Sequence, residues 1–361
     1  MALLEHLWDE ALVFFSVGGL IQLIKSGDYS SLGTWGGITK VIAPLIPFII
    51  VIEMAMAFFH RRFHVTEYKI PFFIYIFNRV VGRFLSLGVI GFCIGWIQPY
   101  ALLQIPLTWY GFALSYIAWE FSYFIYHYLA HKVRVFWCLH STHHAPEQMN
   151  VAVSFAHFIL EEPYGDFIRT SICILFGVSP AMLFVIMFVD GTWGAFIHVG
   201  ENVLQDARFG PLGRLILTPS HHRVHHARNP LYMDTNFCNL LNIWDRIFRT
   251  YQPEDREIEI DYGVRRTITA GNFLDVYFGE FYFLAKDIIQ APGVFNKLLY
   301  VVMPPGWSHS GEQKTARVIR KRYLASRLDT DRRSQPDAKP PIQAAPLGRN
   351  AREGAYVDCA L

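Results

Sequence analysis

Long apolar segments constrain the fold of this chain most strongly. Residues 36–59 are apolar apart from one Lys and one Glu, residues 84–105 contain no charged side chain, and residues 107–126 contain only Glu120. About 20 apolar residues in a helix cross the hydrocarbon core of a bilayer. Each segment therefore predicts a membrane-spanning helix, and Pro106 predicts a hairpin between the second and the third.

A further apolar segment, residues 168–197, contains the sequence Gly-Val-Ser-Pro at 177–180, which predicts a break between two helices. Four or five hydrophobic helices are thus expected, whereas residues 11–24 are too short to span a bilayer and predict an interfacial helix. The composition, 52% hydrophobic and 16% aromatic, agrees with a membrane protein. The formal net charge of +2 gives no reason to expect nucleic acid as a partner.

Histidines form the second constraint, because eleven of the fifteen lie between His127 and His226. His127 and His131 are four residues apart, so a helix presents both imidazoles on one face. The motifs His140-Ser-Thr-His-His144 and His222-Arg-Val-His-His226 each present three rings along a helix. Adjacent rings such as those of His143 and His144 point about 100° apart on a helix, so each can serve a different metal ion.

These spacings predict a site for two metal ions. Eight histidines of the three motifs, with His198 as a ninth, would give each ion four or five nitrogen ligands. Neutral imidazole does not select among Fe, Zn, Cu and Ni. A structural zinc site needs only four ligands and usually includes thiolates, but no cysteine here belongs to a CxxC pair, and a zinc protease motif HExxH is absent. A pair of redox-active irons is the interpretation that uses all nine histidines.

The sequence also allows two other interpretations of the histidines. Histidines inside a membrane can also line the ion path of a metal transporter, which would spread them across several helices near the midplane. A lipid-binding scaffold without catalysis would be expected to have lost motif residues, and none is missing. For His157 and His221 an ordinary structural role is as plausible as a role in the site.

The third motif and the residues after it resemble the fatty acid hydroxylase and sterol desaturase superfamily, whose members are membrane di-iron oxygenases. The resemblance is carried by Thr218-Pro-Ser-His-His-Arg-Val-His-His226, by the later Asn229, Tyr232, Asp234 and Asn236, and by Trp244-Asp-Arg-Ile-Phe248. It covers Trp119 to Tyr251. The segment from His143 to Asn150 is similar to the alkylglycerol monooxygenase branch, whereas Lys132 and the segment Ser154 to His157, with Glu161 nearby, resemble the sterol desaturase and fatty acyl hydroxylase branch.

The resemblance implies roles for particular residues. The iron ligands would be His127, His131, His140, His143, His144, His198, His222, His225 and His226. Asp234, Asn236 and Asp245 would orient ring N–H groups, although capping and turn formation explain these three residues equally well.

The resemblance also implies an activity, in which two non-haem irons use O₂ to hydroxylate or desaturate a lipid such as a sterol, a fatty acyl chain or an ether or amino lipid. The chain has no GxGxxG fingerprint and no CxxCH haem motif. The electrons are therefore expected from a separate donor, which the sequence leaves open as a cytochrome, a ferredoxin or a pterin.

Together these features predict an all-α integral membrane helical bundle with a cytosolic, histidine-rich di-iron helical cap. The cytosolic side follows from basic residues that flank the histidine motifs: Arg61, Arg62, Lys132, Arg134, Arg208, Arg214, Arg223 and Arg228. The expected divisions are an N-terminal interfacial segment (1–35), transmembrane helices (36–126), a histidine-box catalytic domain with a further transmembrane hairpin (127–251), a C-terminal cytosolic helical segment (252–331) and a disordered tail (332–361).

Overall fold

The computed structural model describes Trp8, Leu12, residues 17–27, Ser30, Lys40, Val41, and residues 44–61, 63–269 and 271–334. These residues form helices and no strand; two isolated bridges join Ile216 to Leu241 and Ala227 to Tyr262. The all-α prediction is confirmed for them. The chain divides into two compact units, Met1–Arg320 and Lys321–Leu361. The predicted tail beyond Ser334 lies outside the described residues, as does most of the predicted N-terminal segment.

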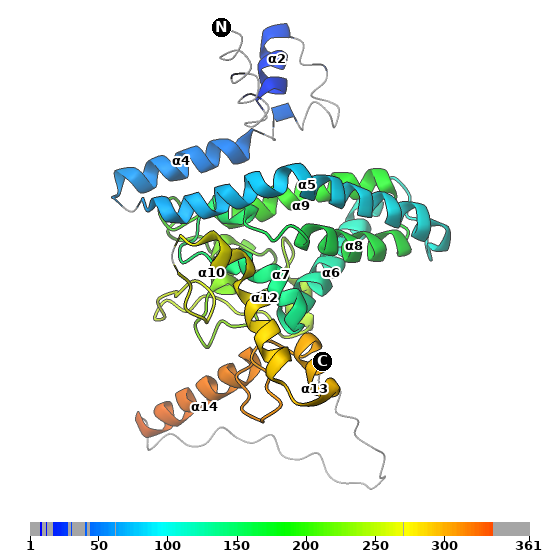
Figure 1. Cartoon of the computed structure of the whole chain (residues 1–361). Helices are drawn as coiled ribbons and strands as arrows, with labels where there is room; N and C mark the ends of the chain where they lie inside the picture. Colours follow the sequence, from blue (N-terminus) through cyan, green and yellow to red (C-terminus); the bar gives the residue numbers. More distant parts are fainter. Residues whose placement is uncertain are drawn as a thin grey trace, which may run out of the picture. The chain divides into compact units, whose positions relative to one another are not determined.

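The elements follow one another along the chain as shown in Figure 1. The α-helices are α2 (Gly18–Ser26), α4 (Leu45–Phe59), α5 (Val65–Ile97), α6 (Trp109–Lys132), α7 (Arg134–His144), α8 (Glu161–Leu175), α9 (Pro180–Ile197), α10 (Pro219–His226), α11 (Ile243–Ile247), α12 (Phe273–Gln290), α13 (Gly293–Val302) and α14 (Ala316–Ser334). Short 3₁₀ helices are η2 (Gln98–Tyr100), η3 (Val151–Phe155) and η4 (Gly210–Arg214).

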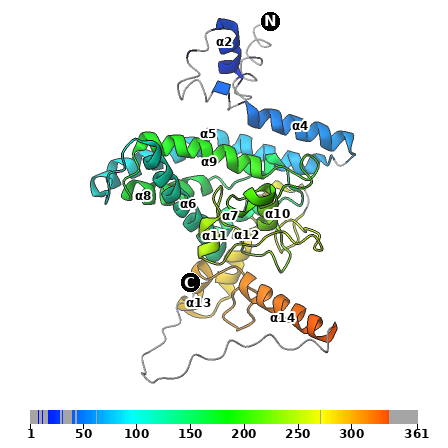
Figure 2. The same ribbon diagram turned by 180° about the vertical axis from the view of Figure 1, so that it is seen from behind.

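Helix α6 joins the apolar helices to the histidine-bearing ones. It packs against α8 and α9 along its length and against α7 near its end, while α12 packs against α7 from the other side. Figure 2 shows α6 and α8 together, with α7 and α10 beyond them. A core of Phe124, Ile197, Leu217, Phe237 and Cys238, all buried, fixes the end of α9 and the loop after α10 against α6.

The predicted break in the segment 168–197 is confirmed, since α8 ends at Leu175 and α9 begins at Pro180. Ser179 caps α9 by accepting a hydrogen bond from the N–H of Met182 at 3.3 Å, and Pro180 occupies the first helical position. Gly177 has a φ of +89°, and a Cβ there would lie 2.0 Å from the carbonyl oxygen of Leu103. Only glycine fits this turn.

Helix α5 differs from the prediction, because residues 84–97 are the second half of a 33-residue helix and not a separate one. The segment 84–105 is defined by its lack of charged side chains, whereas the helix begins before it and includes Arg79 and Arg83. Asn78 is accommodated inside the helix because its side chain donates to the carbonyl of His157 at 2.5 Å and accepts from the hydroxyl of Tyr277 at 3.0 Å. Buried polar groups are tolerated when they are paired in this way.

By length and composition, one described helix, Pro180–Ile197, can cross a membrane, with a mean hydropathy of 1.6. Shorter apolar helical segments are Phe48–Phe59, Phe84–Tyr100 and Gly293–Val302. Large apolar side chains are also strongly exposed around the turn from α5 to α6, among them Trp96, Tyr100, Leu107 and Trp109. Exposed apolar surface of this extent marks a contact with a membrane or with another protein.

Candidate metal centre

The three histidine motifs lie on helices, as their spacing predicts. His127 and His131 occupy the last two turns of α6, and the second motif ends α7. The third motif forms the second half of α10, which begins with a capping box between Thr218 and His221. His198 directly follows α9.

These nine histidines come together in two sets, in each of which the ligand nitrogens lie within 4.8 Å of one another. The five-histidine group is His127, His131, His140, His144 and His225; the four-histidine group is His143, His198, His222 and His226. The adjacent residues His143 and His144 fall into different groups, as their helical spacing predicts, and so do His225 and His226. Each group is the kind of cluster that could hold one metal ion.

In four of these rings the Nδ1 atom, which points away from the other histidines, contacts a backbone carbonyl oxygen. The Nδ1 atom of His127 lies 2.8 Å from the carbonyl oxygen of Phe237, and that of His225 lies 2.8 Å from the carbonyl oxygen of Thr235. In the four-histidine group, His143 Nδ1 lies 3.2 Å from Val153 O, and His198 Nδ1 lies 2.6 Å from Gly194 O. A carbonyl only accepts hydrogen bonds, so each of these Nδ1 atoms carries the proton, and in a neutral ring the Nε2 atom is left with a free lone pair.

These lone pairs face one another inside each group. His127 Nε2 lies 3.1 Å from His140 Nε2, and His143 Nε2 lies 3.2 Å from His198 Nε2. Two unprotonated nitrogens cannot form a hydrogen bond, and the buried Nε2 atoms of His131 and His225 have no hydrogen-bond partner. Such an arrangement is unfavourable without a cation between the nitrogens. The donor set therefore fits a metal ion in each group.

The spacing of the nitrogens also bears on coordination geometry. The close Nε2–Nε2 distances in the two groups range from 2.9 to 3.2 Å. With metal–nitrogen bonds of about 2.1 Å, two ligands at a right angle lie about 3.0 Å apart, and two ligands of a tetrahedral ion lie about 3.4 Å apart. The observed distances lie in the range that neighbouring ligands of one ion occupy, so one metal ion fits in each group.

Burial keeps the rings neutral and ready to bind metal. It lowers the pKa of His225 to about 3, and burial together with neighbouring histidines holds the pKa values of His222 and His226 well below the usual range. A metal ligand must be the unprotonated imidazole. The cluster therefore does not have to release protons at neutral pH before an ion binds.

Glu161, at the start of α8, is the residue of this centre that sequence reasoning did not assign. Its buried carboxylate accepts hydrogen bonds from His140 Nδ1 at 2.5 Å and from the hydroxyl of Tyr126 at 2.8 Å. The other oxygen lies 3.0 Å from Nδ1 of His157, whose ring stacks on His143 with centroids 4.4 Å apart. Glu161 thus contacts one histidine of the five-histidine group directly and one of the four-histidine group through His157.

Of the expected supporting residues, Asp234 contacts the cluster. Its carboxylate lies 3.5 Å from His131 Nδ1 and forms an ion pair with Lys132. Asp234 has a φ of +56°, a conformation that Asn and Asp tolerate better than most residues.

Asn236, Asp245 and His221 act on the backbone around the cluster. Asp245 accepts hydrogen bonds from the N–H groups of Phe237 and Cys238 at 2.8 and 2.9 Å, so it fixes the loop whose Phe237 carbonyl holds His127. Asn236 donates to the carbonyl of His221 at 3.0 Å. The His221 side chain bonds to Thr218 and to the hydroxyl of Tyr251, so it caps α10 and contacts no other histidine of the cluster.

Residues 112–250, which contain all nine histidines, match the family model of the fatty acid hydroxylases. Human alkylglycerol monooxygenase is 32% identical over 202 residues, which cover 56% of this chain and 43% of that protein. The alkylglycerol monooxygenase of Caenorhabditis elegans is 32% identical over 214 residues, covering 56% and 40%. An ornithine lipid hydroxylase of Rhizobium tropici is 28% identical over 157 residues, covering 42% and 45%.

The chain spans less than half the length of each of these curated relatives. No solved structure matches it.

Proposed function

We propose that this chain, whose residues 112–250 match the fatty acid hydroxylase family model, is a membrane enzyme that uses two irons and O₂ to hydroxylate or desaturate a C–H bond of a lipid. One iron would be held by the five-histidine group and the other by the four-histidine group. Asp234 and Glu161 would orient His131 and His140. His157 would support His143, whereas Asn236, Asp245 and His221 would hold the surrounding backbone.

The main support for this proposal is that the unprotonated Nε2 atoms of the histidines face one another within each group. In each group, rings whose outer nitrogen is tied to a carbonyl or carboxylate turn an unprotonated nitrogen toward a common centre. Each group consists of histidines alone, without a carboxylate or a thiolate, and imidazole is a ligand that suits iron. Non-haem iron supplies the activation of O₂ that an unactivated C–H bond requires.

Hydroxylation converts R–H, O₂, two electrons and two protons into R–OH and water. The electrons come from a separate donor, for which a cytochrome, a ferredoxin and a pterin are the candidates. The protein's own part is to fix the imidazoles, to exclude bulk water by burying them and to admit the lipid. The two relatives named for alkylglycerol and ornithine lipid support a lipid with a polar headgroup as the substrate.

A location in the membrane is supported by α9 and by the exposed apolar surface at the turn from α5 to α6. Several passes through the bilayer, with the histidines on the cytosolic side, remain part of the proposal. A metal transporter would need successive sites along a path. Here nine histidines gather in two adjoining groups close to the ends of their helices, which favours catalysis.

The test is lipid oxidation in ¹⁸O₂ by iron-loaded protein in detergent, with a chemical reductant and total lipid extract. A gain of one labelled oxygen by a lipid is the expected result, and a loss of two hydrogens would indicate desaturation. His143→Ala and His225→Ala, one from each group, should each abolish the reaction, whereas His309→Ala, at an exposed position outside both groups, should not. Full turnover in both cluster variants would reject the proposal.

A further inference from the structure

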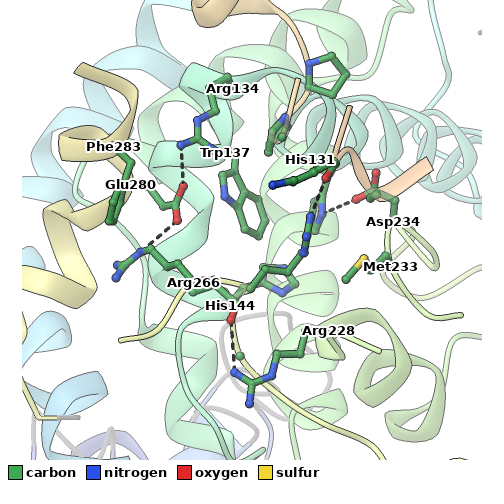
Figure 3. Close-up of a pocket in the computed structure, with 18 of the residues that line it drawn as sticks. His131, Arg134, Trp137, His144, Arg228, Met233, Asp234, Arg266, Glu280 and Phe283 are labelled. Atoms are coloured by element: carbon green, nitrogen blue, oxygen red, sulfur yellow. Dashed lines mark hydrogen bonds and ion pairs between the residues drawn. The ribbon is translucent and has the colours of Figure 1, made fainter. Parts of the chain in front are cut away.

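A cavity of about 640 Å³ extends from the metal centre to the protein surface (Figure 3). Its inner end is formed by His131, His144 and His225 of the five-histidine group and by His226 of the four-histidine group. The volume lies within the range of about 300–1,000 Å³ that is usual for ligand sites. The cavity is large enough for part of a lipid and opens onto both groups.

The wall next to the histidines is largely apolar. Trp137 packs against two of them, with ring centroids 5.2 Å from His131 and 5.5 Å from His144, and Met233 and Phe283 also line the space. Side chains of this kind favour a hydrocarbon chain close to the metal centre over water.

Most charges along the cavity neutralise one another. Glu280 lies between two arginines, 3.2 Å from Arg134 and 3.1 Å from Arg266, as Figure 3 shows. Asp275 pairs with Arg266 at 2.6 Å and balances the second arginine. Arg228 pairs with Asp261 at 2.8 Å, and Asp234 pairs with Lys132. These groups are satisfied within the protein, so they need no ligand.

Two lining cations differ from the rest. Arg265 and Lys314 are exposed, and among the described residues neither has a carboxylate within ion-pair distance. The guanidinium group of Arg265 is held beside the backbone of Lys314, because Arg265 Nη1 donates to the carbonyl of Lys314 at 2.6 Å. The N–H of Lys314 in turn donates to the carbonyl of Gly306 at 2.8 Å. Asp287 is the one lining carboxylate without an ion pair among the described residues. The two unpaired cations and this one unpaired anion give the cavity a net charge of +1 from unpaired groups.

The surface beside the cavity is suited to lipid. The inner face of α12 contributes Glu280 and Asp287 to the lining, whereas the opposite face exposes Leu274, Phe278 and Ile289. The next helix, α13, has no buried residue and exposes Val294, Phe295, Leu298 and Val302. Exposed apolar surface of this kind is suited to contact with lipid or with another protein.

We propose that this cavity binds the reacting lipid and that Arg265 and Lys314 bind an anionic group, a phosphate or a carboxylate, of its headgroup. The chain of the lipid then extends past Trp137 to the metal centre. This inference rests on the proposed function, because it names the class of lipid that the same site takes. Neutral lipids with the same chain bind less well, since they leave the two cations without a partner.

The experiment compares two probes that differ only in a phosphate: hexadecylglycerol and hexadecylglycerol phosphate. Binding to the metal-loaded full chain in detergent is followed by tryptophan fluorescence, because Trp137 lines the cavity. The phosphate-bearing probe should bind at least about tenfold more tightly. Lys314→Gln and the double variant Arg265→Gln/Lys314→Gln should reduce this preference in steps, and Arg265→Lys, which keeps the charge, should retain most of it.

The matched control is Arg256→Gln, which removes one positive charge at an exposed position that does not line the cavity. Its preference should equal that of the unmodified chain. Equal affinities for both probes in the unmodified chain, or an unchanged preference in the double variant, would overturn the inference. Inorganic phosphate that binds as tightly as the lipid probe would also overturn it, because the site would then be one for a free anion.

Binding and turnover separate this inference from the proposed function. A phosphate preference that depends on Arg265 and Lys314, without any lipid oxidation, would refute the enzyme assignment and leave the headgroup site standing. Lipid oxidation without a preference would refute the headgroup site alone.

Discussion

Glu161 offers the sharpest test of how the metal centre is held. In Glu161→Gln the side chain keeps its size but loses its charge, so the hydrogen bond from His140 Nδ1, at 2.5 Å, becomes a neutral one. The new amide NH₂ group also faces either the N–H group of His140 or the Nδ1 atom of His157. The hydrogen bond that fixes the ring and the tautomer of His140 is therefore weakened.

The size of the effect follows from the contacts. A hydrogen bond to a charged group contributes about 1.5–3 kcal/mol, and a neutral one about 0.5–1.5 kcal/mol. The loss at His140 is then about 1–1.5 kcal/mol, or roughly tenfold in metal affinity, and the misplaced NH₂ group adds to it. A reduction of about 10–100-fold is the range expected when the partner of a ligating histidine is removed.

The assay is anaerobic titration of metal-free protein with Fe(II) or Co(II), followed by absorbance and by metal analysis. We expect two metal sites, of which the five-histidine group is weakened in Glu161→Gln. The control is Glu162→Gln, which removes the same charge from the next residue, an exposed one. Two sites of unchanged affinity in Glu161→Gln would refute the reasoning, as would an equal loss in Glu162→Gln.

Three further predictions concern stability. Asp245→Asn should lower both the melting temperature and the metal content, because one of the N–H groups of Phe237 and Cys238 loses its acceptor at a cost of about 1–3 kcal/mol; an unchanged melting temperature would contradict this. Gly177→Ala should lower the melting temperature by several degrees or prevent folding, whereas Gly91→Ala, where a Cβ meets nothing within 4 Å, should not. Metal-free protein should lose stability as the pH falls from about 6.5 toward 3. The pKa of His225 is about 3 in the folded chain and 6.5 ordinarily, so only the unfolded chain takes up the proton in this range. A melting temperature that does not change between about pH 7 and pH 5 would contradict this prediction.

Much of the centre was predictable because its ligands obey local helical geometry. The spacing of the motifs places His127 and His131 on one face and sends His143 and His144 to different groups. His198 has no such spacing, and only the resemblance pointed to it. The helix break at Gly177 was also predictable, since Gly and Pro act on the backbone directly.

The rest depends on contacts between residues far apart in the chain. Glu161 is 21 residues from His140, and the Phe237 carbonyl that holds His127 is 110 residues away. A backbone carbonyl has no sequence signature at all. The length of α5 was missed for the same reason, because Asn78 is satisfied by Tyr277, which is 199 residues distant.

The most direct test of this account is a crystal structure of iron-loaded protein with anomalous data collected at the iron edge. We predict two iron peaks in each chain, one among the nitrogens of His127, His131, His140, His144 and His225, and the other among those of His143, His198, His222 and His226. A single peak, or two peaks outside these groups, would contradict the central claim.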